Sequence, residues 1–415
     1  MSKTIIIIGA GLAGLSAALQ AAENGCNVKL VSSLPSERAQ SVMAEGGINA
    51  ALNTKDENDS PEEHFTDTIK AACGLADPNA VWGMTQAAPE LVHWLLKLGV
   101  KFNMSGYDDV DLRNFGGQKK KRTAFAQSDT GKQIMTAMID AVRRKEASGM
   151  VERFSHHSFL TLRLCGNICC GCVIRDEYSQ ETVELPGDAV IVATGGMHGL
   201  FGNTTGSLSN TGEVTAELFR LGVPLANGEM IQYHPTTVKC GGKRMLISEA
   251  ARGEGGRLFA MKDGKQWYFM EEKYPELGNL MPRDITAREI WKVSHESEVF
   301  LDMTEISEEI ISNKLSGLAD DCMTYLHKDI RKEPVSVLPG IHYFMGGILV
   351  DEQHRTPIQN LYAAGECCAQ YHGANRLGGN SLLGALYGGR VAAKSACEQA
   401  DVVDLSCATQ IDFPP

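Results

Sequence analysis

The sequence predicts an α/β fold, in which a Rossmann-like domain is interrupted by an inserted α+β capping domain. A β-branched stretch at 4–8 runs into the glycine-spaced segment 9–14. A strand, a tight turn and a helix in this order open a dinucleotide-binding unit. Two further apolar strand patterns, at 188–196 and 358–365, also end in small residues. The segment 228–343 between them carries polar clusters instead, so distant parts of the chain are expected to build one domain that the middle covers.

The glycine segment has Gly9, Gly11 and Gly14 in the spacing GxGxxG. Such glycines permit a tight turn and let backbone N–H groups approach a pyrophosphate at the start of the following helix. The spacing alone is weak evidence, and it is the ordered strand, turn, helix and second strand at 28–31 that make it specific. An acidic residue is usual after the second strand, but Ser32 stands there, which argues against a nicotinamide cofactor.

The rest of the chain alternates helical and strand patterns. Helices are predicted at 61–73, 78–98, 130–148 and 380–400, and a β-meander at 151–185. We expect a discontinuous dinucleotide-binding domain formed by 1–227 and 344–415, with 228–343 as the capping and substrate domain. A mobile cap of this kind can close over a site and exclude water.

The composition is that of a globular intracellular protein. Of its 415 residues 43% are hydrophobic, and the net charge of −12 makes nucleic acid and anionic membranes poor partners. The apolar start is interpreted as part of the fold and not as an export signal, and no run is long enough to span a bilayer. The twelve cysteines are expected to be reduced thiols. Cys165, Cys169, Cys170 and Cys172 fit neither zinc nor iron–sulfur spacing, so no metal is expected.

Five polar clusters in the second half of the chain pair His or Arg with Gly or Pro. They are QYHPT (232–236), SEAARGEGG (248–256), PRD (282–284), HYFMGG (342–347) and HGANRLG (372–378). Glycine allows the backbone to approach a ligand closely, and fixed cationic donors hold an anion. Any one cluster is more often structural, as a satisfied histidine or a surface ion pair. All five, beside a dinucleotide fingerprint, predict an anion-binding active site.

Together these motifs resemble the flavoprotein subunit of fumarate reductase and succinate dehydrogenase, a family that includes L-aspartate oxidase. The matching segments follow the family's order along nearly the whole chain. Besides the clusters above they are GAGLAGL (9–15), AEGGINAAL (44–52), NFGGQKKKRTAFA (114–126), DTGKQI (129–134), ATGG (193–196), AAGE (363–366) and the extension of the last cluster to HGANRLGGNSL (372–382). The resemblance implies an FAD-binding domain with an inserted cap, and an oxidoreductase that moves a hydride between FAD and a C4 dicarboxylate.

The resemblance also assigns catalytic roles. Flavin N5 would deliver a hydride to one alkene carbon, Arg283 would give a proton to the other, and Glu249 and Arg252 would reprotonate Arg283. The substrate-binding residues would be His234, Ser248, His342, Arg376 and Phe115. Preorganised Arg and His donors suit this chemistry because negative charge builds toward one carboxylate. An arginine acid, with a reference pKa above about 12, requires a dry site and concerted proton transfer. The competing structural interpretation of Arg283 is an ion pair with Asp284.

The same resemblance implies the FAD contacts. The expected residues are Gly9, Gly11, Gly14, Ser32, Ser41, Gly46, Gly47, Ala193, Thr194, Gly195, Glu213, Glu366, Ser381 and Leu382. The first three would lie at the pyrophosphate, Glu366 would bind ribitol or ribose hydroxyls, and Ser381 and Leu382 would face the isoalloxazine from a helix start. Glu213 falls where the family often has Asp.

Two departures from the family shape the expected attachment and partners. Membrane-complex members bind FAD covalently through a His shortly before the AEGG segment, where this chain has Gln40. Gln cannot form that link, so FAD should be noncovalent, and the lower flavin potential favours fumarate reduction. The sequence given also stops where family members continue into a C-terminal helical domain, so we expect it to lack some of the usual partner surface. We expect a dicarboxylate substrate, an iron–sulfur or other redox partner subunit, no direct membrane span, and a cytoplasmic location that reaches the inner membrane face only through a partner.

Fumarate reduction to succinate is the leading hypothesis, and alternatives stay open. L-aspartate oxidase is compatible with Gln40 and with the LMPRD stretch at 280–284, but no acid matches its ammonium-binding pattern. Phe115 and Arg122 resemble the reductase more. The others are reduction of another unsaturated acid, a nicotinamide dehydrogenase and a noncatalytic flavin electron-transfer subunit. The intact His and Arg set argues against the noncatalytic role.

Overall fold

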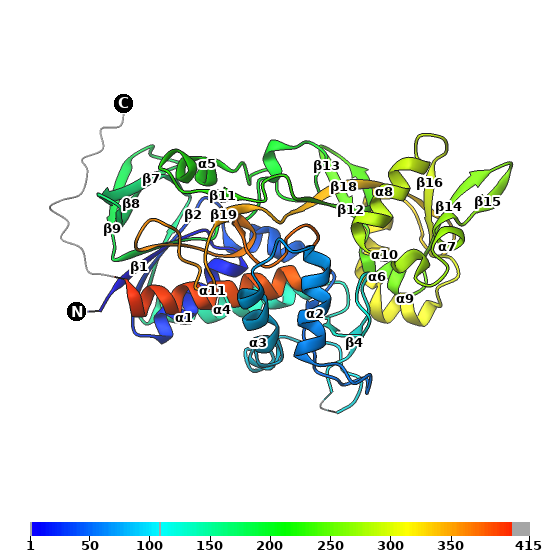
Figure 1. Cartoon of the computed structure of the whole chain (residues 1–415), viewed down its shortest axis with the longest axis horizontal. Helices are drawn as coiled ribbons and strands as arrows, with labels where there is room; N and C mark the ends of the chain where they lie inside the picture. The colour runs from blue at the N-terminus through cyan, green and yellow to red at the C-terminus, as the bar shows by residue number, and fades with distance from the viewer. Residues whose placement is uncertain (1, 108, 401–415) are drawn as a thin grey trace.

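The computed structural model describes residues 2–107 and 109–400, and its frame is a parallel sheet. The strand order is β20–β10–β1–β2–β6, and neighbouring strands are parallel throughout. The strands are β1 (Thr4–Ile8), β2 (Asn27–Ser32), β6 (Val151–Ser155), β10 (Ala189–Val192) and β20 (Leu361–Ala363). Segments from both ends of the chain share this sheet (Figure 1), so the predicted α/β class is confirmed.

Strand β1 shows why its sequence is an unbroken apolar run. Ile5 and Ile7 pack into a core on one face of the sheet, whereas Ile6 and Ile8 pack into a second core on the other face. Because side chains alternate across a strand and a parallel sheet is covered on both sides, every position from Ile5 to Ile8 is apolar. The first face carries α1 (Leu12–Glu23), α4 (Thr130–Ala147) and α11 (Asn380–Gln399), and the second carries β7 (His157–Cys165), β8 (Ile168–Asp176) and β9 (Thr182–Pro186) (Figure 1).

The helices begin where polar residues can cap them. Proline occupies the first position of both α2 (Pro61–Ala72) and α3 (Pro78–Lys97). Ser60 accepts a hydrogen bond from Glu63 N, and Asp77 accepts one from Asn79 N. These contacts satisfy N–H groups that the first turn of a helix leaves unpaired.

The predicted β-meander differs from the structure at its start. Residues 151–155 join the parallel sheet as β6, and the meander contains only β7, β8 and β9. His156 has a φ of 58°, a left-handed conformation that ends one strand before the next begins. Sequence alternation alone does not reveal which sheet a strand joins, because β6 and β7 have similar patterns.

The middle of the chain forms two antiparallel sheets around a core of its own. The first sheet contains β12 (Ile231–Cys240), β13 (Lys243–Leu246) and β18 (Leu338–Phe344). The second contains β14 (Arg257–Lys262), β15 (Lys265–Trp267), β16 (Val299–Asp302) and β17 (Val335–Ser336). Helices α6 (Glu249–Gly253) and α8 (Arg283–Val293) start beside the first sheet (Figure 1). We call this part of the molecule the cap.

Shorter elements connect these parts. They are β3 (Ile48–Asn49), β4 (Leu112–Arg113), β5 (Thr123–Ala124), β11 (Leu225–Ala226), β19 (Gly347–Leu349), β21 (Cys368–Ala369), α5 (Glu213–Arg220), α7 (Phe269–Lys273), α9 (Glu308–Lys314), α10 (Ser316–Asp321), η1 (Ser36–Arg38), η2 (Gln40–Met43), η3 (His198–Leu200), η4 (Gly278–Leu280), η5 (Cys322–Leu326) and η6 (Gly365–Cys367). Across the described ranges, no helix is both long and apolar enough to cross a membrane, and no cluster of potential metal ligands occurs among the same residues.

Ten of the cysteines in the described part of the chain are free thiols. They include Cys169, Cys170 and Cys172 of the dense group, which lie on β8. Burial raises the pKa of the Cys169 thiol to about 12, so this thiol is an unreactive part of the core. Cys165 is disulfide-bonded, and the expectation of reduced thiols throughout is therefore wrong at this position.

Candidate active site

A cavity of about 610 Å³ lies between the parallel sheet and the cap. Gly9, Ser32 and Ala193, at the ends of β1, β2 and β10, line one side, and His234 and Arg283 of the cap line the other. The carboxyl ends of parallel strands are where such sheets bind ligands. The volume also falls within the range of about 300–1,000 Å³ that is usual for small-molecule sites.

The glycine turn at one end of the cavity depends on the absence of side chains. At Gly9, where φ is 109°, a Cβ would lie 2.3 Å from the carbonyl oxygen of Ala193, and at Gly14 it would lie 1.8 Å from that of Gly9. Gly11 precedes α1 without a side-chain cap and lines the cavity, whereas Gly14 packs behind the turn. The N–H groups at the start of α1 therefore present the positive end of the helix dipole to an anion.

A second helix start opens onto the same cavity. Gly379 precedes α11 with a φ of 87° and without a side-chain cap, and Ser381 and Leu382 in its first turn line the cavity. The remaining predicted flavin-side residues also line it, namely Ser41, Gly46, Gly47, Thr194, Gly195, Glu213 and Glu366. A cavity with glycine walls, a carboxylate and two helix starts whose N-cap residues are glycines fits a dinucleotide with an anionic centre.

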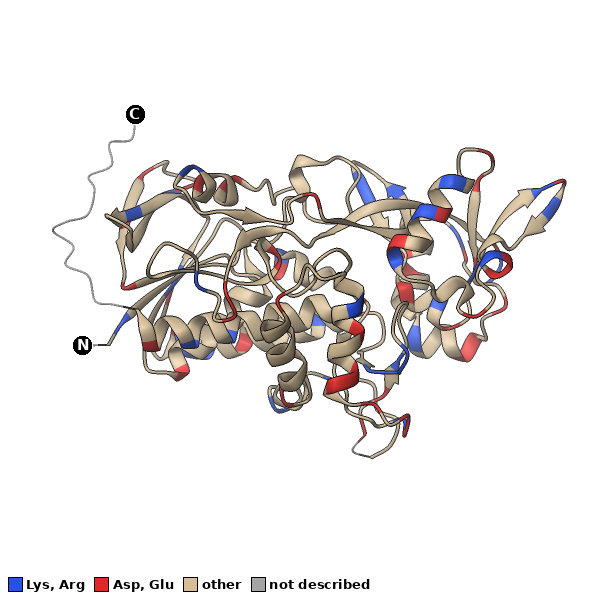
Figure 2. Ribbon diagram, viewed as in Figure 1, with Lys and Arg blue, Asp and Glu red and all other residues tan. Residues whose placement is uncertain are grey.

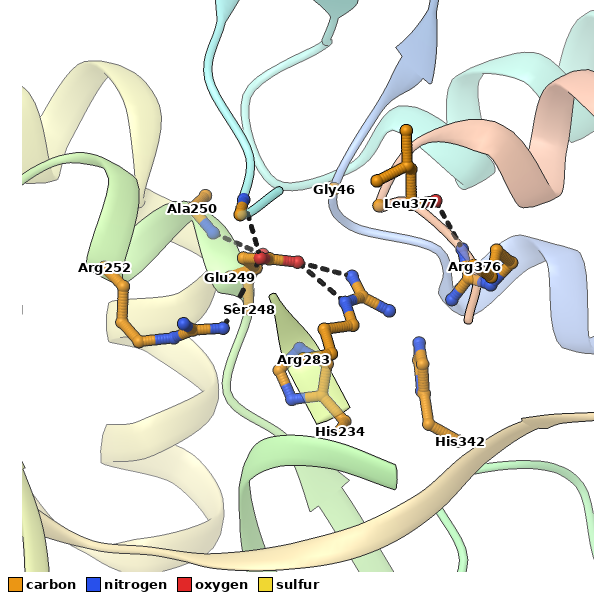
Figure 3. A network of polar contacts seen from close by, with 12 residues as sticks. Gly46, His234, Ser248, Glu249, Ala250, Arg252, Arg283, His342, Arg376 and Leu377 are labelled. Atoms are coloured by element: carbon orange, nitrogen blue, oxygen red, sulfur yellow. Dashed lines mark hydrogen bonds and ion pairs between the residues drawn. The ribbon is translucent and has the colours of Figure 1, made fainter. Parts of the chain in front are cut away.

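At the cap end, one carboxylate joins two arginines. Glu249 is the first residue of α6, and Arg283 is the first residue of α8. The Arg283 guanidinium donates to Oε2 of Glu249 through Nε at 2.8 Å and Nη2 at 2.6 Å (Figure 3). Oε1 of Glu249 accepts from the backbone N of Gly116 at 2.9 Å and lies 3.5 Å from Nη2 of Arg252. All three side chains are almost completely buried.

These ion pairs decide the charge of the buried groups. Burial alone would raise the pKa of Glu249, but Arg283 and Arg252, with the hydrogen bonds from Arg283 and Gly116, bring that pKa below its usual value. Glu249 is therefore ionised at neutral pH. Burial lowers the pKa of Arg252, against the attraction of Glu249. Acidic and basic residues lie close together along the ribbon of this part of the cap (Figure 2).

The predicted substrate-binding residues surround the space in front of Arg283. His234 on β12 and His342 on β18 have ring centroids 5.1 Å apart. The guanidinium of Arg376 lies over the ring of Tyr343, 4.3 Å from its centroid. Figure 3 shows His342 extending toward the space between Arg283 and Arg376.

Phe115 and Ser248 complete this wall of the cavity. Both line the cavity, and Phe115 packs so tightly that a Cβ at Gly46 would lie 2.8 Å from its ring. The hydroxyl of Ser248 also caps α6 by accepting from Ala250 N. Ser248 therefore has a structural role beside any contact with a ligand. The structure thus brings all the predicted catalytic and substrate-binding residues to one place.

The two histidines are neutral at physiological pH. Burial, followed by Arg283, lowers the pKa of both His234 and His342 well below the usual value. Burial also lowers the pKa of Arg376 to about 9, so Arg376 remains a cation. Nε of Arg376 is a buried donor without a protein partner, and a cationic donor of this kind suits a carboxylate. Nε2 of His234 is also buried without a protein partner. A local cationic pocket therefore exists in a protein whose net charge is −12.

Comparison with known proteins agrees with this geometry. A protein-family model described as an FAD binding domain matches residues 4–382. The succinate dehydrogenase flavoprotein subunit of Bacillus subtilis is 44% identical over 97% of this chain and 70% of its own length. The chain belongs to the succinate dehydrogenase and fumarate reductase flavoprotein family. This family member binds FAD and is an oxidoreductase that acts on CH–CH groups.

Other relatives show how widely the family extends. A fumarate reductase (CoM/CoB) subunit of Methanothermobacter marburgensis is 34% identical over 95% of this chain and 72% of its own length. L-aspartate oxidase of Streptomyces coelicolor is 34% identical over 95% of this chain and 69% of its own length. A solved structure of the Escherichia coli quinol fumarate reductase flavoprotein, a variant, superimposes with a TM-score of 0.90 at 30% identity, covering 98% of this chain and 72% of that one.

Several residues of this flavoprotein site were not assigned a role from the sequence. Gln232 accepts from Nη1 of Arg283 at 3.1 Å and donates to the carbonyl oxygen of Arg376 at 2.7 Å, so it connects two arginines of the site. Its place two residues before His234 on a strand was the available signal, because such residues share a face. His198 contacts Glu366 at 3.1 Å, and no motif marked it.

Proposed function

We propose that this chain reduces fumarate to succinate with noncovalently bound FAD. The observation that carries the proposal is the pairing of Arg283 with Glu249 in a cavity that His342 and Arg376 also line. A dianionic alkene needs donors that hold its carboxylates and a proton source beside one alkene carbon. This pocket contains candidates for both tasks.

Some residues of the pocket bind the substrate carboxylates, and others transfer the proton. His342 and Arg376 bind the carboxylate toward which charge develops, and His234 and Ser248 bind the other. Bound FAD, in its reduced form, would supply the hydride. Arg283 donates a proton to the remaining alkene carbon, and fumarate thus gains one hydride and one proton to become succinate. Protons return to Arg283 through Glu249, which Arg252 contacts from the other side.

The burial of the trio supports an arginine acid. Arg283 is 6% exposed, and Glu249 and Arg252 are each 2% exposed, so bulk water does not compete for the proton. In such a site, electrostatic interactions with the developing charge are stronger than in water. Transfer from Arg283 then becomes favourable only as the hydride arrives.

Gln40 supports the noncovalent attachment. It lies on η2 and lines the cavity, at the place where the sequence lacks the tethering His of membrane-complex relatives. An amide side chain forms no bond to the flavin, and loss of the tether favours reduction of fumarate. Acid precipitation should release all the FAD into the supernatant, and flavin retained on the polypeptide would contradict this attachment.

Aspartate oxidation is the second candidate, because L-aspartate oxidase of Streptomyces coelicolor is among the relatives. An aspartate substrate carries an ammonium group, which needs an acidic or carbonyl acceptor in the pocket. Glu249 is the acid beside the proposed substrate position, and Arg283 and Gly116 N already occupy its two oxygens. This favours a substrate without an ammonium group.

The electrons for fumarate reduction would come from a redox partner. The Bacillus subtilis and Methanothermobacter marburgensis relatives are named as subunits, so we infer that the donor is an iron–sulfur or other redox subunit. The flavoprotein would work in the cytoplasm and reach the inner face of the membrane only through that partner.

The deciding experiment is anaerobic. The bound FAD is reduced with light, and fumarate, iminoaspartate or another enoate is then added while flavin absorbance is followed. Rapid reoxidation by fumarate with stoichiometric succinate is the expected result. Reoxidation by iminoaspartate alone would favour the oxidase, and no reoxidation by any enoate would refute the proposal.

A further inference from the structure

We propose that two consecutive threonines, Thr204 and Thr205, determine which ring nitrogen of His198 and His342 carries the proton. In both rings Nδ1 would accept from a threonine hydroxyl, so that Nε2–H is the donor. One such donor is directed at Glu366 on the flavin side, and the other at the substrate cavity. The part that concerns His342 deepens the proposed function, whereas the part that concerns His198 depends only on FAD binding.

The backbone explains how neighbouring residues reach two different histidines. Thr204 pairs with Ile341 of β18 in a parallel bridge. Ile341 N donates to the carbonyl oxygen of Asn203 at 2.8 Å, and Thr205 N donates to that of Ile341 at 2.9 Å. Consecutive side chains of an extended segment point in opposite directions. Oγ1 of Thr204 accordingly lies 2.8 Å from Nδ1 of His198, and Oγ1 of Thr205 lies 2.8 Å from Nδ1 of His342.

The neighbours of Thr205 decide which ring nitrogen of His342 carries the proton. Burial, with Arg283 and Arg376 nearby, lowers the pKa of His342 well below its usual value, so the ring is neutral and has one N–H. The carbonyl oxygen of Ile341 already accepts from Thr205 N, and it lies 3.5 Å from the hydroxyl, which is long for a hydrogen bond. The hydroxyl therefore donates to Nδ1, and Nε2–H remains for a carboxylate in the cavity.

The contact with Glu366 decides which ring nitrogen of His198 carries the proton. Nε2 of His198 lies 3.1 Å from Oε1 of Glu366, and the same oxygen accepts from Phe344 N at 3.0 Å. A carboxylate oxygen requires a donor, so Nε2 carries a proton. Oγ1 of Thr204 lies closer to Nδ1 of His198, at 2.8 Å, than to the carbonyl oxygen of Ile341, at 3.2 Å, so its hydroxyl donates to Nδ1. Oγ1 of Thr204 in turn accepts from Gly206 N at 3.0 Å.

The His198 ring has no room to turn over. It is fully buried, meets the Phe344 ring edge-on at a centroid distance of 5.0 Å, and would lie 2.2 Å from a Cβ at Gly206. His198 therefore holds Glu366 in a fixed position at the wall of the cavity. Both threonines act through a histidine and are positioning residues.

The direct test is the nitrogen spectrum of the histidine rings. The oxidised FAD-loaded protein is labelled with ¹⁵N-histidine, and His198→Gln and His342→Gln assign the two rings. We expect unprotonated Nδ1 and protonated Nε2 in both. Protonated Nδ1 in either ring, alone or in a doubly protonated imidazolium, would overturn the proposal for that ring. This measurement needs no substrate, so it remains decisive even if fumarate is not the substrate.

A binding test separates the two threonines. Thr→Val keeps the shape of the side chain and removes the hydroxyl, and Thr→Ser keeps the hydroxyl. Thr205→Val should raise the Kd for fumarate, measured by flavin absorbance of the oxidised holoenzyme, by about tenfold, as expected for one lost hydrogen bond to an anion. Thr204→Val should increase FAD release on dilution, measured by flavin fluorescence, by about the same factor.

The serine variants are the control for a defect in folding or packing. Thr204→Ser and Thr205→Ser should restore most of the affinity, because the hydroxyl donor is present again. Equal losses in the Val and Ser variants would show that packing, and not the proton position, is responsible, and would overturn the proposal. Wild-type affinity in a Val variant would also overturn it. If the wild-type flavin does not respond to fumarate, the proposed substrate is wrong, and the Thr204 variants and the ring spectra still decide the inference.

Discussion

The buried trio of Glu249, Arg283 and Arg252 matters both for the proposed proton transfer and for the stability of the surrounding structure. Arg283 and Arg252 contact opposite oxygens of one carboxylate. Without Glu249, two buried cations would face each other unpaired. Removing one partner of a buried ion pair is costly even where the intact pair adds little net stability. Variants of the trio must therefore be checked for folding before their kinetics are interpreted.

Arg283→Ala is expected to keep bound FAD and to lose fumarate reduction by a factor of about 10²–10⁴, the usual contribution of a general acid. Flavin absorbance after gel filtration and anaerobic turnover measure the two properties. Arg288→Ala is the matched control, because Arg288 lies on the same helix, is 62% exposed in its side chain and pairs only weakly with Asp284 at 3.9 Å. Full turnover by Arg283→Ala would exclude Arg283 as the proton donor.

The candidate residues could be named from the sequence, but most of the contacts that hold them in place could not. His234, Arg283, His342 and Arg376 stand out because each lies in a local cluster with glycine or proline. The hydrogen bond from Gly116 N to Glu249, in contrast, joins residues that are 133 positions apart. Such a contact depends on how the cap is placed, and local patterns do not contain that information.

At the scale of elements, strands and helices with strong local signals were predictable. β1 follows from its β-branched run, and α2 and α3 follow from their caps and first-turn prolines. The assignment of β6 to the parallel sheet was not predictable, because strand pairing is decided by distant partners. Two-residue strands such as β3 and β5 carry too few residues for a periodic signal.

The start of α1 gives a prediction at this scale. Gly14→Ala places a Cβ 1.8 Å from the carbonyl oxygen of Gly9, so the helix must move away from the turn that would hold the pyrophosphate. We expect a loss of about 1–3 kcal/mol in unfolding free energy, as for other overpacked sites, and weaker FAD retention. Urea unfolding and FAD release on dilution measure these effects. Gly228→Ala, where a Cβ meets nothing within 4 Å, is the control, and equal behaviour of the two variants would contradict the steric argument.

At the scale of the whole molecule, buried ionisable groups couple folding to pH. Burial is the main cause of a lowered pKa in five histidines, His64 (to about 3), His354 (to about 4), His234, His342 and His372. The unfolded chain binds these protons near pH 6.5, whereas the folded chain does not. Glu45 has the opposite effect, because burial raises its pKa to about 8 and the folded chain holds a proton that the unfolded chain has lost.

The contribution of the histidines to stability should therefore be complete above pH 6.5 and should fall as the pH drops below it. Five protons gained by the unfolded histidines, less one held by Glu45 in the folded state, leave a difference of about four protons. Each proton changes the free energy of unfolding by about 1.4 kcal/mol per pH unit.

His354→Gln tests this coupling at one residue. It should reduce the loss of unfolding free energy between pH 7.5 and 5.5 by about 1.4 kcal/mol, as measured by urea unfolding of the holoenzyme at both pH values. His93→Gln, which changes an exposed histidine on α3, serves as the control. A wild-type stability that does not change over this range, or that rises toward pH 5.5, would show that the buried histidines gain protons in the folded protein.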